Sequence, residues 1–127
     1  IIVTDLVDTV FEKKTKSISR LYHSVIDEFN PAQILIITSN HVIKLMEVLA
    51  EKDDLNIPNK QVIENTKPPI FFKRHPSLLK QLNTWNRGTL SDIIEILSET
   101  TIETRKNNDL SVELTERCLL KISSLKN

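Results

Sequence analysis

Hydrophobic residues recur every three or four positions along most of the chain, which is the spacing of one helix face. This pattern predicts main helices over residues 15–29 and 31–53, and others that open at Pro76, after Gly88 and near Ser111. Shorter helices are predicted over residues 3–12 and from Pro58. The expected fold class is therefore all-α, a bundle of about five main helices plus short helices in a single domain.

Polar residues mark where two of these helices begin. Asn30 can accept hydrogen bonds from the free amides of the next turn, and Pro31 is well tolerated at the first helical position. Thr89 and Asp92 have the spacing of a capping box, with Asp in place of the usual Glu. We therefore expect Gly88 to separate two helices and the second of them to begin at Thr89.

The aliphatic positions suggest which surfaces are buried. The run at residues 34–37 is apolar on all sides of its helix, so we expect this helix to be the most buried element. Ile36 and Ile37 are assigned to a wide core. The helix after Gly88 is expected to bury Leu90, Ile93, Ile94, Leu97 and Ile102. Four further aliphatics lie off the main stripes and are either core or contacts to a partner: Ile43, Val48, Ile96 and Leu120.

Composition narrows the class of protein. The 127 residues suffice for one core and carry no net charge, so no global attraction to nucleic acid or to a membrane is expected, although a local basic patch is possible. Cys118 is the only cysteine, which suits a reducing compartment, so we expect a cytoplasmic location. No signal peptide or apolar run of membrane-spanning length is visible. The chain starts at Ile1 rather than Met, so we expect a fragment of a longer protein.

The residues give little sign of catalysis. Gly88 is the only glycine, and phosphate-binding loops or dinucleotide fingerprints need several, so no cofactor is expected. His23, His41 and His75 lie in separate elements without ligand spacing, so no metal site is expected. Cys118 falls on the apolar face of the last helix, which favours a buried, inert thiol over a nucleophile. We expect no catalytic residue.

The segment PPIFFKRHP, residues 68–76, departs from the helical pattern, and its prolines should turn the chain between two halves of the bundle. Residues 65–91 contain no acidic side chain, and their cations alternate with aromatic rings. Such a surface can hold a phosphate backbone and stack on bases, so the candidate DNA contact is Phe71, Phe72, Lys73 and Arg74. The alternative is that the rings pack inward while the cations stay solvated. We expect one phenylalanine to anchor the corner and the other to be partly exposed.

Four stretches in order along the chain carry a resemblance. They are DLVDTVFEKKTKSISRLYHSVIDE at residues 5–28, NPAQILI at residues 30–36, PPIFFKRHPSLLKQLNTW at residues 68–85 and SVELTERCLLKI at residues 111–122. This ordered set resembles the C-terminal domain of the delta subunit of bacterial DNA polymerase III, over nearly the whole chain. Residues 53–67 are polar and match no part of the family's pattern.

The resemblance implies a role in the clamp loader, the ATP-driven machine that places the sliding clamp on primed DNA. Residues 1–127 would be the helical C-terminal domain that joins the other loader subunits in a heteropentameric collar. The ATPase-like N-terminal domains, one of which grips the sliding clamp, would be absent. This part of the protein would not be an enzyme, although its parent is a subunit of a DNA-directed DNA polymerase, a nucleotidyltransferase.

Two other functions remain open from the residues. The first is an unrelated all-α interaction or adaptor module, which would share the fold but not the partners. The second is a helical enzyme, which would need several titratable groups converging on a pocket. Association with the other loader subunits without ATP would distinguish the collar domain from an adaptor.

Overall fold

The computed structural model describes residues 2–126, and the regular elements in this range are seven α-helices and two short 3-10 helices. The helices are α1 (Ile2–Phe11), α2 (Thr15–Val25), α3 (Pro31–Leu55), α4 (Asn59–Asn65), α5 (His75–Thr84), α6 (Arg87–Lys106) and α7 (Ser111–Ser123). The 3-10 helices, Phe72–Arg74 and Asn108–Leu110, lead into α5 and α7. The predicted all-α bundle is confirmed.

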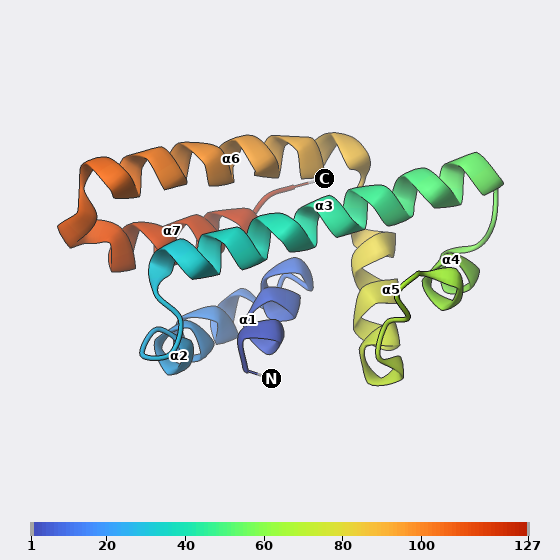
Figure 1. Cartoon of the computed structure of the whole chain (residues 1–127), viewed down its shortest axis with the longest axis horizontal. Helices are drawn as coiled ribbons and strands as arrows, with labels where there is room; N and C mark the ends of the chain where they lie inside the picture. Colours follow the sequence, from blue (N-terminus) through green and yellow to red (C-terminus); the bar gives the residue numbers. More distant parts are fainter. Residues whose placement is uncertain (1, 127) are drawn as a thin grey trace.

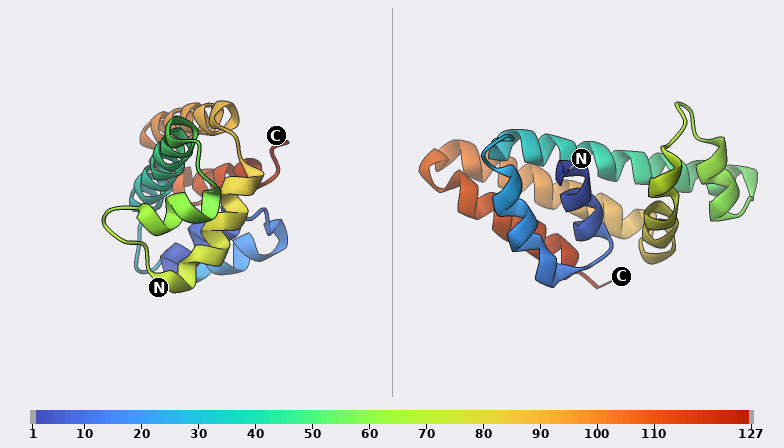
Figure 2. Two further views of the ribbon diagram at one scale, coloured as in Figure 1. Left: turned by 90° about the vertical axis from the view of Figure 1, so that its right-hand side faces the viewer. Right: turned by 90° about the horizontal axis from the view of Figure 1, so that it is seen from below.

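Helix α3 runs along the length of the molecule and organises the others around it (Figure 1). Helix α6 lies beside it, α7 folds back under α6, and α1 and α2 cover the lower side. Helices α4 and α5 form a smaller unit at the C-terminal end of α3, and the views in Figure 2 show their connecting loop projecting from that end. The core is continuous between these groups, because buried side chains from all seven helices belong to one cluster.

Helix ends follow the capping chemistry, with two differences from expectation. Asn30 forms the predicted cap of α3, accepting from the Gln33 amide at 2.9 Å while Gln33 Oε1 accepts from the Asn30 amide at 2.9 Å. Helix α2 ends at Val25 rather than residue 29, since the chain must turn before the extended backbone of Asn30. Helix α6 begins at Arg87, so the predicted start at Thr89 is wrong. Asn86 accepts from the Thr89 amide at 2.8 Å, and asparagine is the stronger cap.

Burial corrects three expectations about aliphatic residues. Ile36 is 60% exposed, so α3 is not buried on all sides, whereas Ile37 does pack against the core. Ile102 is 53% exposed, because Thr100 and Thr104 continue the buried stripe of α6 from Leu97. Four aliphatics were predicted as either core or partner contacts. Val48 is buried, Ile96 and Leu120 are partly buried against the core, and Ile43 is exposed.

Among the described residues, only α3 is long and apolar enough to cross a membrane by length and composition, with a mean hydropathy of 1.2 in its most apolar window. The core helix of a bundle meets the same criterion, and α3 contacts α1, α4, α6 and α7. This feature of α3 is therefore weak evidence for a membrane span.

Candidate binding corner and its polar cluster

The corner between α4 and α5 is a short loop followed by a single 3-10 turn. The Arg74 amide donates to the Phe71 carbonyl at 2.9 Å, and the His75 ring bonds the Ile70 carbonyl at 3.0 Å. Pro76 sits in the first turn of α5, where its missing N–H costs nothing. The segment does turn the chain, and it joins α4 to α5.

Both phenylalanines of the corner are exposed. Phe71 is 59% and Phe72 67% exposed, and their rings meet edge to face with centroids 5.1 Å apart. The prediction that one of them anchors the corner is therefore wrong. Ile70 packs against the core instead, and a hydrogen-bonded arginine supplies the second attachment described next. The two rings are left on the surface.

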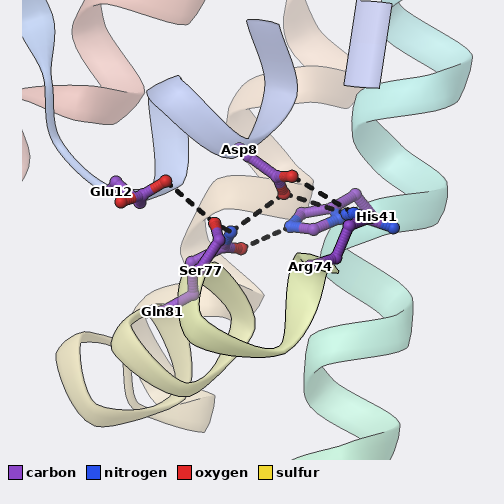
Figure 3. Close-up of polar contacts among 6 residues, drawn as sticks. All are labelled: Asp8, Glu12, His41, Arg74, Ser77 and Gln81. Atoms are coloured by element: carbon purple, nitrogen blue, oxygen red, sulfur yellow. Dashed lines mark hydrogen bonds and ion pairs between the residues drawn. The ribbon is translucent and has the colours of Figure 1, made fainter. Parts of the chain in front are cut away.

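The two cations of the corner have different surroundings. Lys73 is exposed, with its ammonium 6.0 Å from the centroid of the Phe71 ring. Arg74 turns back to α1, where Nε and Nη2 donate to the two carboxylate oxygens of Asp8 at 3.2 and 2.9 Å (Figure 3). The charge of Arg74 is thus largely compensated within the protein, while that of Lys73 is available on the surface.

Asp8 and Arg74 belong to a polar cluster that joins three helices and the corner (Figure 3). Gln81 is its centre and is fully buried. Its amide nitrogen donates to Asp8 Oδ1 and to Ser77 Oγ, both at 2.9 Å, and Ser77 donates to Glu12 at 2.8 Å. The cluster therefore holds α1, α5 and the corner in a fixed arrangement.

His41 of α3 completes this cluster. Its Nε2 lies 2.6 Å from Gln81 Oε1. Because that oxygen can only accept, Nε2 carries the proton. Burial lowers the pKa of His41, and the Gln81 hydrogen bond and the charge of Asp8 oppose this shift only in part. The ring is therefore neutral at physiological pH, and it packs on Phe11 with centroids 5.1 Å apart.

The polar groups of the cluster connect α1, α3, α5 and the corner. Its carboxylate, guanidinium and amide groups bond to one another, and the neutral imidazole faces an amide rather than a nucleophile. Sequence patterns did not find this cluster, because its partners lie 66 and 73 positions apart in the pairs Arg74–Asp8 and Gln81–Asp8. The one available signal was Asp8 on a helix whose other inward positions are apolar.

Two cavities flank the corner, and Phe71 and Arg74 line both of them. The first, of about 280 Å³, has a mostly apolar lining from α3, α4, α5 and the proline loop. The second, of about 650 Å³, lies over α1 and is lined by three carboxylates, those of Asp5, Asp8 and Glu12, together with Lys73. The corner thus separates an apolar hollow from an acidic one.

The remaining candidate groups lie apart from this corner. Cys118 is buried on α7, and burial raises the pKa of its thiol despite a hydrogen bond from Thr100. His23 of α2 lies 3.3 Å from Glu116 of α7, and neither residue belongs to the polar cluster. Within residues 2–126 no group of three metal-ligating side chains comes together.

Comparison of this chain with protein-family models, with curated proteins and with solved structures finds no match. Function therefore has to be inferred from the surfaces of the chain and from the resemblance of its motifs.

Proposed function

We propose that this chain is a non-catalytic assembly domain, the collar-type C-terminal domain of a bacterial clamp-loader delta subunit. Two features support the proposal besides the resemblance of the motifs. The fold is an all-α bundle, as a collar domain requires. The polar groups that converge in the fold satisfy one another, as expected of a domain without an active site.

The observation that carries the assembly role is a pair of exposed isoleucines on α3. Ile36 and Ile43 are 60% and 45% exposed, and they lie seven residues apart. Seven residues are close to two helical turns, so both side chains project from the same face. Burying either side chain fully under a partner helix would contribute about 1.5–3 kcal/mol. This face is where we place the contact with a neighbouring subunit of the collar.

The test is association without ATP. The chain is mixed with the other loader subunits and analysed by sedimentation velocity. The unmodified chain should co-sediment with them, and the double variant Ile36→Glu/Ile43→Glu should not, because two buried charges would have no partner. The matched control is Leu55→Glu/Leu110→Glu, which changes two other exposed aliphatics and should leave association unchanged. Failure of the unmodified chain to associate would reject the collar role.

Within the assembled loader, we place the exposed corner against the template strand near the primer junction. Phe71, Phe72 and Lys73 supply stacking surfaces and a free cation, whereas Arg74 positions them through Asp8. The variants to measure are Phe71→Ala, Phe72→Ala and Lys73→Glu, with Arg74→Glu as a test of positioning and Lys106→Glu as a charge-matched control. All three corner variants should weaken DNA binding by the full loader, and Lys73→Glu should also reduce its salt dependence, because it alone of the three removes a cation. Unchanged affinity at physiological salt would remove the DNA contact but not the collar role.

An unrelated all-α adaptor module is the second candidate, and the same pair of isoleucines favours it. It would bind a helical partner through α3 but would not associate with loader subunits. The sedimentation experiment separates the two functions, since only the collar domain associates with the loader set.

A further inference from the structure

We propose that the apolar cavity under the proline loop is a docking site for an acidic peptide segment of a partner protein, which inserts one bulky apolar side chain. This surface is distinct from the Ile36–Ile43 face and does not depend on the collar role. We call it the corner cavity. Its floor comes from helices α3, α4 and α5, and its rim from residues 68–71.

The volume and lining of the corner cavity suit an apolar side chain. The cavity measures about 280 Å³, just below the roughly 300–1,000 Å³ typical of pockets for drug-sized ligands. Seven of its lining residues are aliphatic or aromatic: Leu45, Val48, Ile63, Ile70, Phe71, Leu78 and Leu82. A phenylalanine or leucine side chain inserted there would exchange water for apolar contacts on several sides.

The charged residues that line the corner cavity favour a partner segment with negative charge. No carboxylate lines it, and its three basic residues are His41, Lys44 and Arg74. His41 is neutral and held by Gln81, and the guanidinium of Arg74 is held by Asp8. The ammonium of Lys44 has no ion pair or hydrogen bond with any other residue in the range 2–126. One uncompensated ammonium beside an apolar hollow attracts a carboxylate next to the inserted side chain.

The backbone of the rim determines how a peptide can bind. Pro68 and Pro69 have no N–H to offer, so a peptide cannot pair with them as an added strand. Recognition must therefore come from the inserted side chain and from Lys44. Lys67 precedes the prolines and is exposed, so a second carboxylate of the peptide would meet a second cation at this end of the loop. Nucleic acid would lack the apolar group that fills the cavity.

The experiment is a titration of the 127-residue chain followed by methyl and amide NMR. The probe is the capped peptide Asp-Leu-Phe-Asp, and its matched controls are Lys-Leu-Phe-Lys and Asp-Ala-Ala-Asp. The probe should shift the methyl signals of Val48, Ile63, Leu78 and Leu82, with a Kd of roughly 1 mM or below. Both control peptides should bind at least about tenfold more weakly, because each lacks either the charge or the apolar group.

Two protein variants make the assignment sharper. Lys44→Glu reverses the charge that lines the cavity at a partly exposed position of α3, and it should weaken binding of the probe about tenfold while leaving the other signals in place. Lys106→Glu makes the same charge change at the far end of α6 and should leave the affinity unaltered. Amide spectra of both variants report whether the fold is retained.

The proposal is overturned by any of three results. The first is the absence of shifts around the corner cavity. The second is equal binding of the acidic and the lysine peptides. The third is complete displacement of the probe by octanoate at equal concentration, which would assign the cavity to a free carboxylate. Failure of the chain to associate with loader subunits would leave all of these measurements unaffected, so the two proposals fail separately.

Discussion

Arg74 binds both carboxylate oxygens of Asp8, a residue 66 positions earlier in the chain. This contact fixes the corner to α1 and orients the exposed Phe71 and Phe72 that precede it. Because the pair lies between the acidic cavity and the corner cavity, its geometry determines the shape of both. The stability of the bundle and the presentation of the corner are therefore linked through one ion pair.

Removing the cation of this pair should destabilise the fold. Arg74→Leu leaves the carboxylate of Asp8, 11% exposed, without its cation, and we expect the free energy of unfolding to fall by about 2–3 kcal/mol. This loss of unfolding free energy is smaller than is usual for a buried ion pair, because the Arg74 side chain is 33% exposed. Urea denaturation measures the change.

The double variant Asp8→Leu/Arg74→Leu should recover part of this loss, since two apolar groups then replace the pair. Arg87→Leu is the control, because its contact with Asp53 at 3.7 Å is between two exposed side chains and should contribute below about 1 kcal/mol. A double variant less stable than Arg74→Leu would contradict this account of the cluster.

The stability of the fold should fall in mild acid through His41. Its folded pKa lies below the ordinary value of 6.5 because of burial, so the unfolded chain binds more protons between these two pKa values. The free energy of unfolding should therefore decrease as pH falls below about 6.5, and it should rise as pH increases through that window. In His41→Gln this part of the pH dependence should be absent. Thermal unfolding between pH 7 and pH 5 compares the two proteins, and equal slopes would exclude His41 as the source.

Cys118 should react with thiol reagents only after the fold opens. The side chain is buried, and the raised pKa of its thiol lowers the fraction of reactive thiolate at neutral pH. Labelling by an aromatic disulfide reagent should be at least about a hundredfold slower in the native protein than in urea. Free glutathione at the same pH is the reference for an accessible thiol. A native rate near that of glutathione would show that α7 opens readily.

The start of α6 provides a test of the capping assignment. Asn86→Ala removes the acceptor for the Thr89 amide and should cost about 1 kcal/mol of unfolding free energy. Thr89→Ala is the matched control, since Thr89 lies inside the first turn and its side chain is not the cap. We expect the control to change stability by less than half as much. If Thr89→Ala destabilised the protein more than Asn86→Ala in urea denaturation, the cap would be Thr89, as the sequence pattern predicted.

Sequence pattern predicted the helices well because each buried stripe is a local, periodic signal. It located α3 and its cap at Asn30, and it predicted the short helix from Pro58 that the structure contains as α4. The sequence pattern failed where the burial of a residue depends on which element packs against it. Ile36 belongs to an aliphatic run, yet within residues 2–126 no helix covers its side of α3. Thr100 and Thr104, which look polar in sequence, occupy the buried face of α6 instead of Ile102.

The corner between α4 and α5 also combines features that the sequence predicted with features that it did not. The prolines predicted a turn, which the structure contains, but the pattern of cations and rings predicted one anchoring phenylalanine where both are exposed. Nothing local revealed that Arg74 would face Asp8 or that Gln81 would join α1, α3 and α5. Such contacts depend on how distant helices meet, and the spacing of residues along one helix carries no information about that.

Helix α7 has a consequence for how the chain folds as it is made. The hydroxyl of Tyr22 in α2 donates to the Val112 carbonyl at 2.7 Å, Thr15 and Ser123 share a hydrogen bond of 2.9 Å, and Lys13 donates to the Leu125 carbonyl. Within residues 2–126, the helices that are synthesised first are thus completed by the helix that is synthesised last. Until α7 emerges, Tyr22 lacks this partner and the faces of α1 and α2 that α7 covers stay open, so a nascent chain exposes apolar surface that favours aggregation.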